Sequence, residues 1–506
     1  MCENQNKDRQ RLSLDMNHIS NTKKTIKGLS TQTIVTICMG LGEIIPFSIL
    51  SRLLSKEDFG YFAAIMAITN ILMIFSEAGI GAALVQRKEL TKRYIDTAFT
   101  LGLLLGMVIS ILLFIFSKEF AETFIDSKMV TPLKLISITI LFHSLSSINI
   151  SLMQRRLEFL KVGLIRLFSL LITNIIAIIL AIYHFGYYAI IVKAVLDAIL
   201  TYLVSLTYTG VNFRLCLDKQ MCSDIFKFSG WLTLSSLFRN ISRQIDKLVM
   251  PKVLSVSVLG AYNRPKEFIT LISNKINGIF DVVMFPILSG IKDNISSLCS
   301  AFKKSIYFVN LLSALLFLLF FINSDLIVCV FFGEEWIELS GLFKLLSVAV
   351  LFNINGRLAD CFLRSMGLTK EQFYFRVSEM VVNLIGVLVG CRWGMIGVAA
   401  AVVICDASMK LIKIYYVAHL LNISVLFLFT SLFKSWKFFI IQIPFLYAIY
   451  LLTPSNIFGY IFVCLVFLII NIILFCFFPA VIGNSYYNVA YPHVKKILSS
   501  ILKQFT

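Results

Sequence analysis

The stretch AFTLGLLLGMVISILLFIFS, residues 98–117, runs for twenty residues without a charged side chain. A helix rises about 1.5 Å per residue, so a run of this length crosses the roughly 30 Å hydrocarbon core of a bilayer. The whole chain shares this character: of its 506 residues 58% are hydrophobic and 15% charged, and the mean hydropathy is +0.86. The composition therefore indicates an integral membrane protein.

Apolar runs of similar length recur along the chain and predict an all-α integral membrane protein with about fourteen transmembrane helices. The predicted spans are 29–51, 59–84, 98–117, 132–153, 162–183, 187–209, 228–251, 257–288, 305–328, 341–363, 373–392, 395–417, 437–453 and 457–478.

The connections between these spans differ in charge. Counting each Lys and Arg near a span end with the adjoining loop, 29 fall on the side of the N-terminus and nine on the other. The positive-inside rule then places both termini in the cytoplasm. The net charge of +18 is mostly a topology signal and gives no reason to expect a nucleic-acid partner. The polar first 28 residues, with no small-residue cleavage site after the following span, argue against a cleaved signal peptide.

Two pairs of segments suggest an internal repeat. LLSKEDFGYF (53–62) matches VLSVSVLGAY (253–262) at a Leu, a Ser and a Gly, and FGYYAIIVKAVLDA (185–198) is similar to WGMIGVAAAVVICDA (393–407). Repeats of this kind are typical of two-lobed transporters. The predicted domains are a cytoplasmic tail (1–28), an N-lobe of helices 1–6 (29–209), a C-lobe of helices 7–12 (228–417), an amphipathic connector with helices 13–14 (418–478) and a C-terminal tail (479–506).

The span 228–251 carries an unusual charged stripe. At 100° per residue, Arg239, Arg243, Asp246 and Lys247 fall within an arc of about 100°. A charge at mid-bilayer costs roughly 2.5–3.5 kcal/mol on insertion scales, so these side chains are expected to face a bundle interior or a wet cavity. Three bases against one acid bias that site toward an anion.

Other spans also carry ionisable residues. Lys275 lies beside Asn274, Asn277 and Asp281, and Arg357 shares a face with Asn353 and Asp360. Glu43, Glu77, Asp197, Glu379 and Asp406 are further intramembrane acids, and Arg166 and Lys193 further bases. A purely structural alternative is local pairing, of Lys193 with Asp197, Arg243 with Asp246, and Arg357 with Asp360.

Signatures of enzymes and metal sites are missing from the sequence. It has no G-x-x-x-x-G-K-[ST], no H-E-x-x-H and no G-x-S-x-G, and the five histidines lie far apart. The eleven cysteines lack metal or redox spacing. No catalytic residue, metal ligand or bound cofactor is expected, and the protein is not expected to be an enzyme.

Three stretches resemble a known family: LSRLLSKEDFGYFAAIMAITNILMIFSEAGIGAALVQRKELT (50–91), AYNRPKEFITLISNKINGIFDVVMFPILSGIKDN (261–294) and FFGEEWIE (331–338). The chain is similar to the Wzx-type polysaccharide flippases, for O-antigen, capsule or exopolysaccharide, of the multidrug/oligosaccharidyl-lipid/polysaccharide exporter superfamily. The resemblance implies two six-helix lobes around a central cavity plus two C-terminal helices. It also implies that an undecaprenyl-diphosphate-linked oligosaccharide is moved, by alternating access, between the leaflets of a bacterial inner membrane.

The resemblance suggests roles for the intramembrane charges. A diphosphate requires cations, so the substrate-binding candidates are Arg239, Arg243, Asp246, Lys247, Lys275 and Arg357. The candidates for binding a coupling Na⁺ or H⁺, or for pairing the lobes, are Glu43, Glu77, Asp197, Asp281, Asp360, Glu379 and Asp406. Implied partners are the lipid-linked glycan, membrane lipids, and the glycan polymerase and export machinery; the oligomeric state stays open.

Two rival functions remain from sequence alone. A cation-coupled small-molecule exporter of the same superfamily would share the fold, but its cavity is expected to be acidic because many drugs are cations. A membrane glycan polymerase or ligase is expected to carry a long outer loop, whereas every predicted outer connection here is short.

Overall fold

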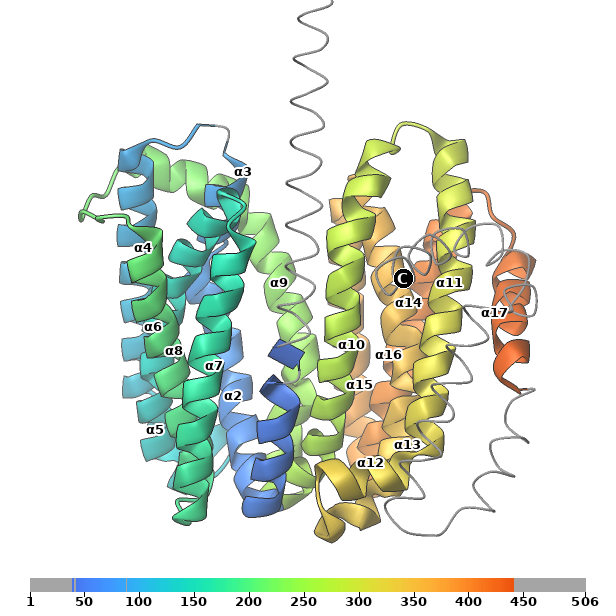
Figure 1. Cartoon of the computed structure of the whole chain (residues 1–506), viewed down its shortest axis with the longest axis horizontal. Coiled ribbons are helices and arrows are strands. Elements are labelled where there is room, and N and C mark those ends of the chain that lie inside the picture. Colours follow the sequence, from blue (N-terminus) through green and yellow to red (C-terminus); the bar gives the residue numbers. More distant parts are fainter. Residues whose placement is uncertain (1–38, 41, 88, 441–506) are drawn as a thin grey trace, which may run out of the picture. The chain divides into compact units, whose positions relative to one another are not determined.

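The structure is a computed structural model that describes residues 39–40, 42–87 and 89–440, and in this part of the chain the regular elements are all helices (Figure 1). Eight helical segments among the described residues are long and apolar enough to cross a membrane. The protein is therefore an all-helical, multi-pass membrane protein. The two spans expected after residue 436 and both tails fall almost entirely outside the described residues, so the count of fourteen stays a prediction.

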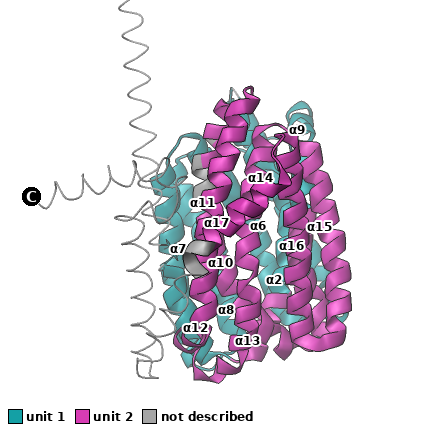
Figure 2. Cartoon of the chain, turned by 90° about the vertical axis from the view of Figure 1, so that its right-hand side faces the viewer, with its two compact units in different colours: residues 1–54, 65–237 teal, residues 55–64, 238–506 magenta. Residues whose placement is uncertain are grey.

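The chain divides into two compact units (Figure 2). Unit 1 comprises residues 1–54 and 65–237, and unit 2 comprises residues 55–64 and 238–506. Helices with residues in unit 1 are α2 (Lys56–Glu77), α3 (Ile80–Gln86), α4 (Lys92–Ile115), α5 (Ser117–Phe124), η1 (Ser127–Met129), α6 (Val130–Arg155), α7 (Phe159–Ile182), α8 (Tyr187–Thr209) and α9 (Lys219–Val253). The first residues of α2 and the last part of α9 belong to unit 2.

Unit 2 continues with a second set of helices. These are α10 (Val256–Gly290), α11 (Ile295–Ile322), α12 (Ser324–Phe331), η2 (Glu334–Leu339), α13 (Ser340–Ser347), α14 (Ala349–Ser365), α15 (Thr369–Gly390), η3 (Cys391–Trp393), α16 (Gly394–Leu420) and α17 (Val425–Ile440).

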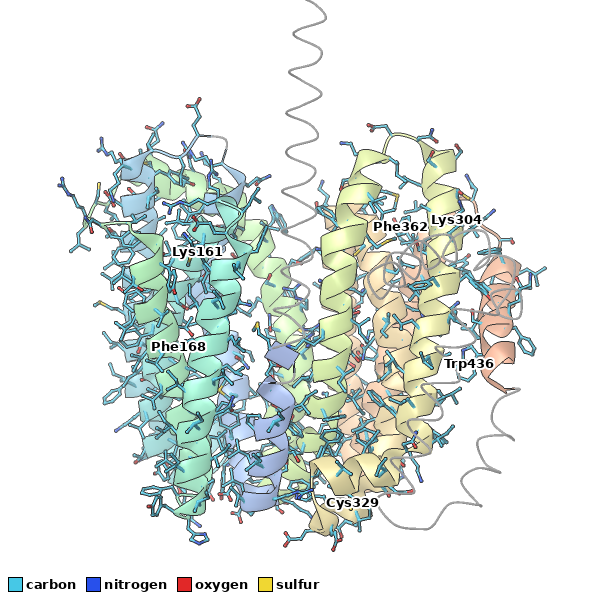
Figure 3. All side chains as sticks on the ribbon, in the orientation of Figure 1. Lys161, Phe168, Lys304, Cys329, Phe362 and Trp436 are labelled. Carbon is cyan, nitrogen blue, oxygen red and sulfur yellow. The ribbon has the colours of Figure 1, made fainter. Side chains whose placement is uncertain are left out.

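The outward face of α7 shows the membrane character of unit 1. Phe168, labelled in Figure 3, is 52% exposed, and Leu164, Leu171, Ile175, Ile179 and Ile182 are exposed at the same helical spacing. The opposite face buries smaller residues, including Ser169, Thr173, Ala177 and Ala181. A helix with a large apolar stripe on its open side and small residues inside is what lipid contact and close helix packing require.

The repeated segments start equivalent helices. Ser55 and Asp58 form a capping box at the start of α2: the amide of Ser55 donates to Oδ2 of Asp58 (2.9 Å) and the amide of Asp58 to Oγ of Ser55 (3.1 Å). Ser255 caps α10 in the same way, accepting from the amide of Val258 at 3.2 Å. The serine shared by the two segments is therefore the N-cap residue in each.

The glycine shared by the two segments permits a close approach of the two helices. A Cβ at Gly60 would overlap the carbonyl oxygen of Val256, and a Cβ at Gly260 would overlap the carbonyl oxygen of Lys56. Each glycine thus contacts the residue four positions before the other, so the contact is reciprocal. Both residues lie in unit 2 because α2 contributes its first residues there.

An aromatic cluster in unit 2 explains the FFGEEWIE stretch. Phe332 and Trp336 are buried and meet edge to face with ring centroids 6.2 Å apart, and Phe268 and Phe343 complete the cluster. Phe59 at the start of α2 contacts Trp336 at 5.9 Å. The stretch therefore packs α10, α12 and α13 together, which is a structural role.

Several predicted spans are interrupted in the structure. The span 59–84 ends at Glu77 because Ala78 and Gly79 have positive φ, and α3 starts after them. The span 305–328 divides between α11 and α12. The span 341–363 divides at Val348, where the amide of Val348 bonds to the carbonyl of Leu345 in an i→i+3 step of 3.3 Å. Hydropathy cannot detect such breaks because the residues around them remain apolar.

The reciprocal glycine contact predicts opposite effects for two substitutions on α10. Gly260→Ala should lower the free energy of unfolding by about 1–3 kcal/mol, because its methyl group overlaps a backbone oxygen that cannot move away alone. Gly278→Ala, where no atom lies within 4 Å of the added Cβ, should raise it by about 0.5–1 kcal/mol because alanine favours a helix. Thermal unfolding of the purified proteins in detergent measures both, and equal shifts would contradict the contact.

Candidate functional site

Four charged side chains of unit 2 form a closed network, here called the quartet: Asp360 on α14, Arg376 and Glu379 on α15, and Lys413 on α16. The guanidinium of Arg376 donates to Asp360 at 2.7 Å and to Glu379 at 2.9 Å. The ammonium of Lys413 lies 3.1 Å from Asp360 and 2.5 Å from Glu379. Each acid therefore contacts both bases, and the quartet has no net charge.

The quartet is deeply buried and joins three helices. Lys413 is 1% exposed, and its ammonium also lies 5.8 Å from the centre of the Phe375 ring. Removing one member of a buried ion pair typically costs about 3–5 kcal/mol because the remaining charge stays buried without its partner. Asp360 and Glu379, candidates for ion coupling from sequence, are thus engaged in a link between α14, α15 and α16.

An arginine group, defined as Arg239 and Arg243 of α9 and Arg357 of α14, lies beside the quartet. Arg239 interacts electrostatically with Arg243, Arg357 and Arg376, as well as with Asp360. Arg243 interacts with Arg357 and Arg376 and with the acids Asp406 and Glu379. The structure therefore brings together three of the six residues that the sequence suggested for substrate binding.

A polar group of five side chains adjoins the arginine group: Ser242 (α9), Asn353 (α14), Asn383 (α15), Asp406 and Lys410 (both α16). The amide nitrogen of Asn383 donates to Oγ of Ser242 at 2.9 Å and to Oδ1 of Asp406 at 3.4 Å. Lys410 contacts Oδ2 of Asp406 at 2.9 Å and also donates to Oδ1 of Asn353. Asp406 retains 29% exposure of its side chain.

These neighbouring groups carry an excess of positive charge. The bases are Arg239, Arg243, Arg357, Arg376, Lys410 and Lys413, and the acids are Asp360, Glu379 and Asp406. Within this set of nine side chains, on α9, α14, α15 and α16, the bases outnumber the acids by three. Such an excess is costly in a bilayer and is typical of a site for an anion.

The other predicted substrate residues lie elsewhere in unit 2. Asp246 is buried and forms an ion pair with Lys266 of α10, so its partner is not Arg243 as local pairing would have it. Lys247 follows Asp246 and is half-buried. Lys275 lies further along α10, also half-buried. Asp281 lies on the same helix, and its side chain is outside the described part of the chain.

Unit 1 contains a separate group of ionisable side chains. It includes three acids that the sequence suggested for ion coupling or lobe pairing, Glu43, Glu77 and Asp197. Glu77 of α2 lies 3.0 Å from Nδ1 of His143 on α6. Asp197 of α8 interacts electrostatically with His143, Arg166 of α7 and Lys193 of α8. Arg166 also interacts with Glu43, which lies in the helical residues 42–53. These contacts link acids and bases from five helices.

Sequence reasoning missed several residues of these groups. Arg376, Lys410 and Lys413 are among the 29 bases counted with the loops on the N-terminal side because they lie near span ends, yet in the structure they lie on α15 and α16 among buried side chains. Two of them have a local signal, because Arg376 precedes Glu379 by three residues and Lys410 follows Asp406 by four. Lys266, placed in an outer connection, is the partner of Asp246.

The fold identifies the class of protein. The chain superposes on the lipid II flippase MurJ in its inward closed conformation with a TM-score of 0.68 and 18% identity, covering 87% of this chain and 97% of the other. It also superposes on an inward-facing multidrug resistance MATE family transporter of the MOP superfamily, with a TM-score of 0.62 and 13% identity, covering 77% and 98%. The chain therefore shares its fold with these two transporters.

The sequence defines the family within that class. Residues 49–341 match the Polysaccharide biosynthesis protein family, and the chain belongs to it. It is 25% identical to the teichuronic acid biosynthesis protein TuaB of Bacillus subtilis over 82% of this chain and 86% of that protein. It is also 25% identical to the lipopolysaccharide biosynthesis protein WzxC of Escherichia coli, over 74% and 77%.

These comparisons confirm the family suggested by the sequence. The chain is a membrane protein of the polysaccharide biosynthesis family, and its fold is shared with proteins that are transporters.

The quartet predicts a large and specific loss of stability. Lys413→Met should lower the free energy of unfolding by about 3–5 kcal/mol, because Asp360 and Glu379 would then share a single base. The double variant Lys413→Met/Glu379→Gln removes one charge of each sign and should recover part of this loss. Thermal unfolding in detergent provides the measurement. A single variant as stable as the wild type would show that the quartet does not hold the three helices.

Proposed function

We propose that this protein is a flippase that moves an undecaprenyl-diphosphate-linked oligosaccharide from the inner to the outer leaflet of a bacterial cytoplasmic membrane. The observation that carries the proposal is the positive excess around Arg239, Arg243 and Arg357. A diphosphate carries negative charge that complements these bases, and guanidinium groups match phosphate oxygens in geometry.

The related proteins support the cargo class. TuaB and WzxC are named for the biosynthesis of teichuronic acid and lipopolysaccharide, and a third relative, ExoT of Rhizobium meliloti, for succinoglycan biosynthesis transport. ExoT is 22% identical over 58% of this chain and 60% of its own length. All three names point to carbohydrate polymers. A small-molecule exporter for cationic drugs fits less well, because the basic group would repel such cargo.

In this proposal the two units perform different tasks. The arginine group holds the headgroup during alternating access while the polyprenyl tail stays in lipid. Both chain termini lie in the cytoplasm, and the glycan reaches a polymerase and export machinery after its release. The quartet keeps α14, α15 and α16 in register beneath the bound headgroup, and Lys247 and Lys275 contribute to the positive potential.

The ionisable group of unit 1 suits a role in coupling. Glu77 and His143 lie 3.0 Å apart on different helices, and Asp197 interacts with His143 as well. Histidines and carboxylates grouped inside a membrane protein are typical of proton relays, so this group is proposed to bind the coupling H⁺. Replacement by Na⁺ is the alternative for the same acids.

The arginine group can be tested in the host. In a strain without the chromosomal gene, the Arg239→Ala/Arg243→Ala variant should leave lipid-linked glycan on the cytoplasmic leaflet, whereas wild type should restore its export. Each lost charged hydrogen bond is worth about 1.5–3 kcal/mol, so purified protein should bind undecaprenyl diphosphate at least about tenfold more weakly. Lys304→Ala, at an exposed lysine of α11 labelled in Figure 3, is the matched control. Full export by the double variant at normal expression would refute the assignment.

The coupling role predicts a separable defect. In proteoliposomes with an imposed pH gradient, Glu77→Gln and Asp197→Asn should lose the stimulation of glycan transfer by the gradient. Their binding of undecaprenyl diphosphate should stay unchanged, because the arginine group is intact. If the variants respond to the pH gradient as wild type does, these acids take no part in proton coupling. Stimulation by a Na⁺ gradient alone would assign Na⁺ instead.

A further inference from the structure

The polar group and the arginine group offer opposite hydrogen-bonding chemistry. Guanidinium groups only donate, which suits phosphate oxygens. The side chains of Asn383 and Asp406 present oxygens that accept. A deprotonated diphosphate has no hydrogen to give them, and the carboxylate of Asp406 would repel it. The acceptor oxygens of Asn383 and Asp406 therefore suit a part of the cargo that carries hydrogen-bond donors.

Asn383 has an acceptor that the protein leaves unused. Its side chain is 7% exposed, and its Oδ1 makes no hydrogen bond to any residue that the structure describes. A buried carbonyl oxygen without a donor costs about 1–3 kcal/mol, so native proteins rarely keep one without a reason. Its Nδ2 is fixed by Ser242 at 2.9 Å, which holds the oxygen in one orientation.

The carboxylate of Asp406 lies beside the side-chain amide of Asn383 and remains partly exposed. Its Oδ1 is 3.4 Å from Nδ2 of Asn383, and more than a quarter of the side chain is exposed. The ammonium of Lys410, 2.9 Å from Oδ2, disfavours a metal cation at the same place. A group that merely tied the helices together would not leave the Oδ1 of Asn383 without a donor and the carboxylate of Asp406 partly exposed.

The position of the group limits what can bind. Ser242 directly precedes Arg243 on α9, and Arg243 interacts electrostatically with Asp406 on α16. A ligand whose phosphate lies against the arginine group would thus place the next chemical unit against the polar group. In a lipid-linked glycan that unit is a sugar ring, which carries hydroxyl or amide hydrogens as donors.

We propose that Ser242, Asn383 and Asp406 form a saccharide subsite that accepts hydrogen bonds from the sugar adjoining the diphosphate and so determines which glycans are carried. This inference rests on the proposed function and deepens it. Lys410 orients Asp406, and Asn353 orients Lys410, so these two are positioning residues. Discrimination arises because a sugar that cannot donate at these places would leave buried acceptors unpaired.

The test compares two probes on the full-length protein in nanodiscs: undecaprenyl diphosphate alone, and the lipid-linked glycan isolated from the host strain lacking the gene. Wild type should bind the glycan-bearing lipid about tenfold more tightly than the bare lipid. Asp406→Asn and Asn383→Leu should abolish this preference. Asp406→Asn should leave the binding of bare lipid unchanged or stronger, because it removes a negative charge beside Arg243.

Controls separate a sugar contact from general damage. Ser242→Ala should reduce the preference about threefold through the loss of one neutral hydrogen bond. Ser408→Ala on α16 should not change it, because that hydroxyl donates within its own helix to the carbonyl of Cys405 at 2.9 Å. The preference should also persist when choline replaces Na⁺, and its loss in choline would reveal an ion site and overturn the subsite.

The remaining outcomes separate a failure of the saccharide subsite from a failure of the flippase proposal. If wild type binds both probes equally, the saccharide subsite is wrong while the flippase proposal stands. If it binds neither probe, both fail. If the variants weaken both probes to the same extent, the polar group supports the fold and does not recognise the sugar.

Discussion

The neutral quartet of Asp360, Arg376, Glu379 and Lys413 is the interaction on which the functional region of unit 2 depends. In a membrane interior no water screens a charge, so each of these side chains is tolerable only because two of opposite sign surround it. Because Arg376 and Lys413 contact the acids Asp360 and Glu379 on neighbouring helices, the quartet fixes α14, α15 and α16 against each other. The positive excess that remains nearby then belongs to a rigid framework, which is what recognition of a phosphate requires.

The charged stripe on α9 was only partly predictable from the sequence. Helical angle correctly grouped Arg239 with Arg243, whose side chains interact in the structure. The same angle also grouped Asp246 with them, but three residues of helix add about 4.5 Å along the axis. At that depth Asp246 faces Lys266 of α10. The helical angle shows only which residues share a face of the helix. Which of these residues interact also depends on their depth along the axis, because the neighbouring helices carry their charged residues at particular depths.

Buried bases near span ends were the main omission. Arg376 and Lys413 lie inside the predicted spans 373–392 and 395–417, but each is near a span end and is therefore counted with the adjoining loop. Their partners lie 16 and 53 positions away along the chain, at Asp360. The short repeats, by contrast, were detectable because capping and close packing impose particular residue types: Ser55 and Ser255 cap their helices, and Gly60 and Gly260 make contact.

That last contact restricts which substitutions α2 and α10 can accept where they cross. At most packing sites a larger side chain on one helix can be accommodated by a smaller one opposite. At Gly60 and Gly260 the obstruction is a carbonyl oxygen of the main chain, which every amino acid carries. A smaller side chain elsewhere therefore cannot compensate for replacing either glycine. Compensating pairs of substitutions, which are possible at most packing sites, are not available at this crossing.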